Sequence, residues 1–298
     1  MIFLDATTDI AFKKMLGDPR HPSLTISFLN AMLELPEGKR ITQISHNNTE
    51  NLPLAHESST TTFLDINCTD QEKREYIVEI QRENEGNFIP RAQFYASYCL
   101  ARQITRRTDY VNLKPVILLA IVKQFNLFER HDRYLTHHVM QDRFDGVQDI
   151  AFSEFHFVEL KKFNKKLDEI KNSVTDQWIY LLNNAHELDK IPEQMDNNKE
   201  ITEAMHLLEH ARLSSREFEA YIVQVEAANR IGNVERTAAA LAEARGRAEG
   251  EARGEARGEL TKAYAIAKEL LADGMAADKV AKLTGLSVAE VKALKGSV

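Results

Sequence analysis

Two carboxylates in one short stretch of the chain, Asp65 and Glu79, could face each other across a β-hairpin. Residues 61–69 and 76–81 read as strands, each with one apolar face and one face that carries acids among apolar neighbours. The polar segment between them is short enough to form a hairpin turn. If the turn occupies Gln71–Lys73, the register places Asp65 directly opposite Glu79, with their Cβ atoms roughly 5 Å apart.

Two opposed carboxylates repel each other, so this arrangement needs something that offsets the repulsion. A divalent cation would do so, because Mg²⁺ is typically held by one or two carboxylates together with water and substrate phosphate. Such a cation can polarise a phosphate group and activate a water for attack. Gln81 lies two residues after Glu79, on the same face of its strand. The alternative is an exposed hairpin whose acids simply face the solvent, and the pattern alone leaves both interpretations open.

Strict alternation also predicts an apolar face on each of the two strands, opposite the acids. These apolar faces are Leu64, Ile66 and Cys68 in the first strand, and Tyr76, Val78 and Ile80 in the second.

The elements around the hairpin must hold it in place. Thr7 and Thr8 can cap a short helix from Asp9 to Leu16, which Gly17 ends. Apolar spacing and proline positions predict the other elements of this half. They are a helix over 22–33, a strand over 41–46, a helix from about 90 to 107, a buried strand over 115–122 and a further strand over 152–160. Helices, a hairpin and buried strands in this order predict an α/β fold with a mixed sheet.

The second half of the chain has helical spacing and no strand pattern. Residues 238–260 are rich in Glu, Arg and Gly, with glycines at every fourth position from Gly246 to Gly258. Each glycine costs about 1 kcal/mol of helix propensity relative to alanine, so this segment is either a linker or a helix that contacts a partner helix. The last forty residues contain a glycine turn and a Ser287–Glu290 capping box, which are typical of a small helix-turn-helix unit.

Charge and composition narrow the function classes. The net charge of -7 argues weakly against nucleic acid, but residues 91–171 carry 14 Lys and Arg against 10 Asp and Glu. The longest apolar run, Val116–Val122, is too short to cross a bilayer, and no signal peptide is evident. Cys68 and Cys99 lie in apolar patterns that favour buried free thiols. These features predict a cytoplasmic protein with no membrane partner.

Several motifs occur in the order found in one known family. They are TTDIAFKKMLGD followed by SFLNAML, then DINCTD…YIVEIQRENEGNFIPRAQFYASYCLARQ, then NLKPVILLAIVKQFNLF. This sequence resembles the Rpn family of recombination-promoting nucleases, also called PD-(D/E)XK nuclease family transposases. The resemblance covers roughly residues 5–160, and the linker and tail also fit the family. It implies a restriction-endonuclease-like core, with a mixed sheet flanked by helices, followed by a helical region and a small helical C-terminal tail.

The resemblance implies that Asp65, Glu79 and Gln81 are catalytic residues, and that Asp65 and Glu79 bind Mg²⁺ or Mn²⁺. Gln81 stands where the wider superfamily has lysine. Its amide can orient the attacking water or ligate a metal through its carbonyl oxygen, but it cannot supply positive charge.

Further candidates surround this trio. Asp9 falls where the first helix of these nucleases can offer an additional acid, although the helix dipole alone also favours an aspartate there. Lys13, one turn later, could bind a phosphate or be solvated, and Arg91 could hold a phosphate or the Glu79 carboxylate. The helix that begins near residue 90 offers weaker candidates for the same site, or else a solvated face: Tyr95, Arg102, Gln103 and Arg106.

The pattern and the resemblance together predict a metal-dependent DNA endonuclease that promotes recombination or acts in mobile-element or phage-related processes. Two alternatives are a catalytically silent nucleic-acid-binding or regulatory protein of the same fold, and an RNA-cleaving nuclease. Beside DNA, the expected partner is a second copy bound through the C-terminal helices. The expected parts of the chain are a nuclease core (1–172), a helical region packed on it (173–237), a helical linker (238–260) and a helix-turn-helix-like tail (261–298).

Overall fold

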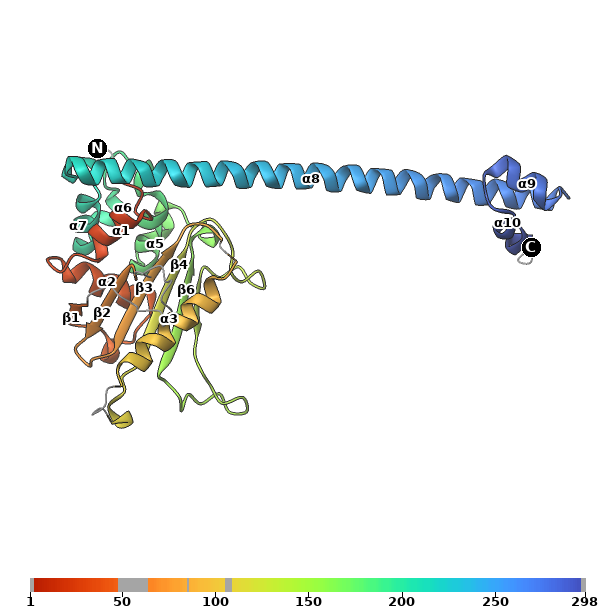
Figure 1. Ribbon diagram of the computed structural model, residues 1–298. Coiled ribbons are helices and arrows are strands. Elements are labelled where there is room, and N and C mark those ends of the chain that lie inside the picture. The colour runs from red at the N-terminus through yellow and green to blue at the C-terminus, as the bar shows by residue number, and fades with distance from the viewer. Residues whose placement is uncertain (1–2, 48–63, 85, 105–108, 296–298) are drawn as a thin grey trace, which may run out of the picture. The chain divides into compact units, whose positions relative to one another are not determined.

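The computed structural model describes residues 3–47, 64–84, 86–104 and 109–295, and the chain forms two compact units that divide after Ala228. The first unit holds a six-stranded sheet in the order β1-β2-β3-β4-β6-β5 (Figure 1). Its strands are β1 Ile44–His46, β2 Ile66–Asp70, β3 Glu75–Gln81, β4 Val116–Val122, β5 Leu135–His138 and β6 Ser153–Glu159. The β3, β4 and β6 strands run parallel to one another and the other neighbours pair antiparallel, so the predicted mixed α/β sheet is confirmed.

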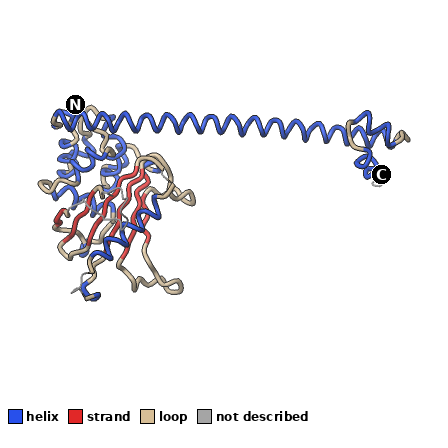
Figure 2. The backbone as a smooth tube through the Cα atoms, viewed as in Figure 1, coloured by secondary structure: helices blue, strands red, loops and turns tan. Residues whose placement is uncertain are grey.

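Helices cover both faces of this sheet. The helices of the first unit are α1 Asp9–Leu16, α2 Pro22–Met32, α3 Phe88–Arg102, α4 Leu167–Ile170, α5 Val174–Asn184, α6 Glu193–Asp196, α7 Lys199–Leu207 and the start of α8 Ser215–Ala272. Short 3₁₀ turns lie in the connections between elements, at Glu37–Lys39, Tyr110–Asn112, Leu160–Lys162, Ala185–Glu187 and His210–Arg212. Figure 2 shows α3 lying across one face of the sheet, while the other helices of this unit gather on the opposite side.

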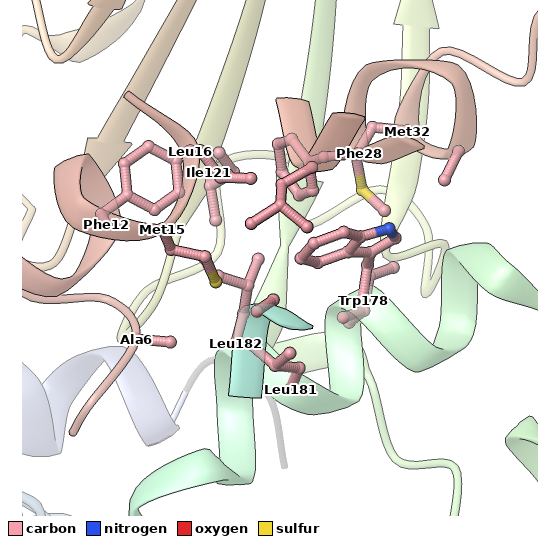
Figure 3. Close-up of a cluster of buried hydrophobic side chains, with 14 of the residues drawn as sticks. Ala6, Phe12, Met15, Leu16, Phe28, Met32, Ile121, Trp178, Leu181 and Leu182 are labelled. Atoms are coloured by element: carbon pink, nitrogen blue, oxygen red, sulfur yellow. The ribbon is translucent and has the colours of Figure 1, made fainter. Parts of the chain in front are cut away.

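The larger core lies between the sheet and helices α1, α2, α5 and α7. Figure 3 shows its centre, where Trp178 of α5 lies beside Phe28 of α2, with ring centroids 5.4 Å apart in an edge-to-face arrangement. The ring of Phe12 in α1 lies beside the same Phe28 ring, with ring centroids 6.4 Å apart. Large aromatic side chains contribute much of the apolar area buried in a core, so this cluster fixes α1 against α2. That fixed helix carries Asp9 and Lys13.

The hairpin has the predicted register. Ile66 pairs with Val78 and Cys68 with Tyr76, which places Asp65, one residue before β2, across from Glu79. The predicted apolar face of the first hairpin strand is wrong at Leu64. This residue packs in the core under α3 rather than with Ile66 and Cys68. The chain bends at Asp65, so the strand alternation does not extend back to Leu64.

Other predicted elements differ at their ends. The helix expected to reach about residue 107 ends at Arg102, and residues 61–63 of the first hairpin strand lie outside the described part. Of the strand expected over 41–46, only Ile44–His46 pairs with β2. The sequence gives no apolar alternation that would set the bounds of β5, because Thr136, His137 and His138 make this segment polar.

The second unit spans residues 229–298 and contains most of α8, α9 Ala277–Thr284 and α10 Val288–Lys295. The helix α8 runs without a break through the predicted linker, because alanine, glutamate and arginine are strong helix formers. A Cβ added at Gly246, Gly250, Gly254 or Gly258 would meet nothing within 4 Å. The predicted capping box is present, since the Ser287 N–H donates to Glu290 Oε2 at 2.8 Å and the Ser287 hydroxyl accepts from the Glu290 N–H at 3.3 Å. Within the described ranges, no helix has the length and apolarity needed to cross a membrane.

Candidate active site

The two carboxylates of the hairpin meet where β2 begins and β3 ends. The Asp65 Oδ2 atom accepts a hydrogen bond from the Ile80 N–H at 2.8 Å. The Asp65 N–H lies 3.4 Å from Glu79 Oε1 and donates to it. Because the backbone of each strand binds the carboxylate of the other, both acids are held in fixed positions at one end of the hairpin.

Burial shapes the electrostatics of this pair. The side chain of Asp65 is 17% exposed, and Glu79 is 7% exposed. Burial raises the pKa of Asp65 to about 6, although the Ile80 N–H and the charge of Lys13 oppose the shift. Burial and the negative charge of Asp65 also raise the pKa of Glu79 well above its usual value. Two buried carboxylates that resist ionisation therefore lie side by side.

A lysine from α1 lies beside these acids. The Lys13 Nζ atom is 3.7 Å from Asp65 Oδ1 and 2.6 Å from Asp9 Oδ1. Burial would lower the pKa of Lys13, but the hydrogen bond to Asp9 and the charges of Asp9, Asp65 and Glu79 raise it overall. Lys13 is therefore a cation whose charge is stabilised by the site.

An arginine from α3 and the amide of Gln81 complete the cluster. The Arg91 guanidinium donates to Gln81 Oε1, and its charge favours the ionised form of Glu79. The Gln81 Nε2 atom donates to the Glu83 carbonyl oxygen at 3.0 Å. Both ends of this amide are engaged, so its orientation is set by Arg91 and by the chain just beyond β3.

The structure brings together six of the candidates from the sequence: Asp9, Lys13, Asp65, Glu79, Gln81 and Arg91. The remaining candidates lie elsewhere. Tyr95 is buried in the core under α3. Gln103 binds the backbone N–H and carbonyl of Lys114, roughly 18 Å along the helix from Arg91. Arg102 pairs with Glu75 at the other end of β3, and Arg106 lies outside the described residues.

A buried ion network next to the site is missed by the sequence reasoning. The Lys123 Nζ atom donates to both carboxylate oxygens of Asp5, at 2.8 and 2.9 Å, and Arg82 Nη1 donates to Asp5 Oδ2 at 2.9 Å. Burial would raise the pKa of Asp5, but the charges of Lys123 and Arg82 hold it well below its usual range. Arg82 and Lys123 become neighbours because they follow the paired residues Gln81 and Val122. Parallel pairing of β3 with β4 is the signal that could have identified them.

We expect the substitution Asp5→Asn to lower the free energy of unfolding by about 3 kcal/mol or more, because it leaves two buried cations without a counter-charge. Urea denaturation at neutral pH measures the change. The matched control is Asp18→Asn, whose carboxylate pairs with the exposed Arg20 and should cost at most about 1 kcal/mol. Equal effects of the two substitutions would contradict a stabilising role for the Asp5 network.

The acid pair fits a hard divalent cation. Carboxylate oxygens are the ligands that Mg²⁺ and Mn²⁺ prefer, and a cation would favour the ionised form of both acids, whose pKa values burial raises. No group of three or more His, Cys, Asp or Glu in the described ranges is arranged to hold a metal. The hairpin itself supplies two carboxylates, Asp65 and Glu79, which is the usual number for Mg²⁺ in sites where water and substrate phosphate complete the shell.

Comparison with known families gives two matches along the chain. The family described as PD-(D/E)XK nuclease family transposase matches residues 6–232, which include every residue of the cluster. The Rpn/YhgA-like nuclease family, C-terminal HTH domain, matches residues 260–296. Neither a search of curated proteins nor a search of solved structures gives a match. The first match spans well over half of the chain, so this protein belongs to the PD-(D/E)XK nuclease family transposases.

Proposed function

We propose that this chain is a Mg²⁺- or Mn²⁺-dependent endonuclease that hydrolyses phosphodiester bonds in DNA, with Asp65, Glu79 and Gln81 as its catalytic residues. The observation that carries the proposal is the buried pair of carboxylates at the end of the hairpin, flanked by Lys13 and Arg91. Membership of a nuclease family supports the same reaction class.

The loss of folding stability that this pair of carboxylates causes favours an enzyme over a catalytically silent protein. Two buried carboxylates that repel each other lower the stability of the metal-free fold above the pH at which they ionise. A protein that only binds nucleic acid has no use for such a pair. Strongly perturbed acids of this kind are characteristic of catalytic sites.

Each side chain has a definite task in the proposed reaction. A bound Mg²⁺ would polarise the scissile phosphate and lower the pKa of a water. Asp65 and Glu79 would hold that ion, and the Ile80 N–H fixes the orientation of the Asp65 carboxylate. Gln81 holds the Arg91 guanidinium beside Glu79, where a positive charge favours the ionised acid.

The C-terminal match favours DNA over RNA as the substrate, because a helix-turn-helix unit is a DNA-binding module. We include in the proposal a cytoplasmic location and a role in recombination or in mobile-element or phage-related processes. The test is to incubate the protein and Mg²⁺ with a supercoiled plasmid and with an RNA transcript of the same sequence. We expect the plasmid to be nicked or linearised and the RNA to survive. Cleavage of RNA alone would contradict the DNA substrate, and survival of both would contradict the nuclease.

We expect a chain that ends at Thr237 to cut saturating DNA within a few-fold of the full-length rate, with weaker DNA binding or a lower oligomeric mass. Every residue of the proposed site lies before this point, in the unit that ends at Ala228. The removed segment has nearly balanced charge and a helix-turn-helix unit, which suits target or partner contact. Light scattering, DNA titration and cleavage rates test it. A truncated protein that is folded and binds DNA normally but does not cut would place the tail in the active site.

A further inference from the structure

The reaction proposed above develops negative charge on a phosphate, and the strand that carries Glu79 supplies no cation for it. Gln81, the next residue on the same face of β3 as Glu79, is neutral. Both ends of its amide are occupied, by Arg91 and by the Glu83 carbonyl. A hydrogen-bond donor that the protein itself provides to the phosphate would therefore come from another element of the fold.

Lys13 meets the geometric requirements for that donor. The helix α1 is fixed by the Thr8 cap and by the burial of Phe12 and Met15 in the core, so the position of Lys13 is set by the fold. Its Nζ atom lies 3.7 Å from Asp65, and its side chain is 37% exposed. An ammonium that borders the acid pair and remains open to solvent can donate to a phosphate that binds at the same pair.

Asp9 keeps this ammonium in place. The Asp9 carboxylate lies one helical turn before Lys13 and 2.6 Å from its Nζ atom, and it is 45% exposed. A lysine has a long, flexible side chain, so a fixed counter-charge reduces the number of orientations that its ammonium can adopt. This makes Asp9 a positioning residue for Lys13.

We propose that Lys13 is the catalytic cation of this site and donates to a non-bridging oxygen of the scissile phosphate. The inference rests on the proposed nuclease function and adds a residue to it. In the reaction, a water oxygen bonds to phosphorus and the bond from phosphorus to one sugar oxygen breaks. The proton of the water passes to solvent, the leaving sugar oxygen takes a proton from solvent, and Lys13 stays protonated throughout. Its charge stabilises the added negative charge as the new bond forms.

The experiment compares Lys13→Ala with Lys14→Ala, which removes the same charge from the adjacent residue. Lys14 pairs with Glu217 and with the Arg212 carbonyl. We expect Lys13→Ala to slow cleavage by about 100-fold or more, the usual effect of losing one donor to a developing oxyanion, and Lys14→Ala to change it by a few-fold at most. Ethylammonium should restore part of the Lys13→Ala rate, whereas tetramethylammonium at the same ionic strength, which cannot donate a hydrogen bond, should not.

A binding measurement tests the same contact without cleavage. Binding of a short DNA duplex is measured over a range of KCl concentrations. Every protein in this experiment carries Asp65→Asn, so that the DNA stays intact. Adding Lys13→Ala should reduce the slope of log affinity against log salt by about 0.9, the value for one phosphate contact, whereas adding Lys14→Ala should leave it unchanged.

Two results would overturn the role of Lys13. One is a Lys13→Ala protein that cuts at the normal rate. The other is a slow Lys13→Ala protein that ethylammonium does not rescue and whose salt slope is normal, which would mean a purely structural role. A wild-type protein that cuts no DNA would contradict the proposed function instead, and the salt slope would still decide whether Lys13 contacts phosphate.

Discussion

Replacing Asp65 with asparagine is expected to abolish cleavage and, at the same time, to stabilise the metal-free protein at pH 8. We expect the cleavage rate to fall by about 1,000-fold or more, because an amide is a poor ligand for a hard cation and one of the two proposed ligands is lost. The fold should tolerate the change, since the amide oxygen can still accept the hydrogen bond that Ile80 donates to Asp65.

The gain in stability follows from the direction of the pKa shift. The pKa of Asp65 is raised to about 6, so the folded state binds its proton more tightly than the unfolded state does. The stability that the protonated Asp65 contributes to the fold is fully present below about pH 4 and is lost as the pH rises through about 6. At pH 8 the ionised carboxylate costs on the order of 2 to 3 kcal/mol, which asparagine would not.

Urea denaturation in EDTA measures the stability, and DNA cleavage in Mg²⁺ measures the activity of the same preparations. Glu72→Gln is a suitable control, because Glu72 lies in the turn of the same hairpin and its side chain is 60% exposed. We expect this variant to match wild type in both measurements. An Asp65→Asn protein that is active, or one that is inactive because it is unfolded, would contradict the proposed site.

The second large effect is expected from the metal. Removing divalent cations with EDTA should stop cleavage, and restoring Mg²⁺ or Mn²⁺ should recover it, because two carboxylates without a cation repel the phosphate. The same ions should raise the melting temperature of the wild-type protein, since a ligand at about 100 times its Kd adds about 2.7 kcal/mol to the stability. This rise should be absent in Glu79→Gln.

Metal binding should also depend on pH in a defined direction. Protons compete with the cation for Asp65 below about pH 6, and for Glu79 over a higher range than is usual for glutamate. The affinity for Mn²⁺ should therefore rise with pH through this range, which calorimetry at several pH values can follow. Cleavage that survives exhaustive chelation, or an affinity that falls as the pH rises, would contradict the metal-dependent mechanism.

The local part of the site was predictable from the sequence. A short polar turn between two alternating segments determines the hairpin register, and that register alone places Asp65 opposite Glu79. The caps at Thr8 and Ser287 follow in the same way from side chains that bind their own helix ends. These features depend on residues that are close together in the chain.

Features that depend on distant contacts were not predictable from patterning. Only the family resemblance placed Asp9 and Lys13 near Asp65, because the packing of α1 against the sheet depends on a core built from four helices. The network of Asp5, Arg82 and Lys123 depends on the neighbouring ends of two parallel strands. The continuity of α8 depends on whether strong helix formers outweigh its glycines, which the sequence left open.

The most direct test of the central claim is a time course of supercoiled plasmid cleavage in Mg²⁺ by wild-type protein and by Asp65→Asn purified in parallel. We predict that the wild-type protein converts the plasmid to nicked or linear forms, that EDTA prevents this, and that the folded Asp65→Asn protein leaves the plasmid intact. Equal cleavage by the two proteins would show that the activity comes from another site or from a contaminant. It would contradict the assignment of Asp65 and Glu79 as the catalytic centre.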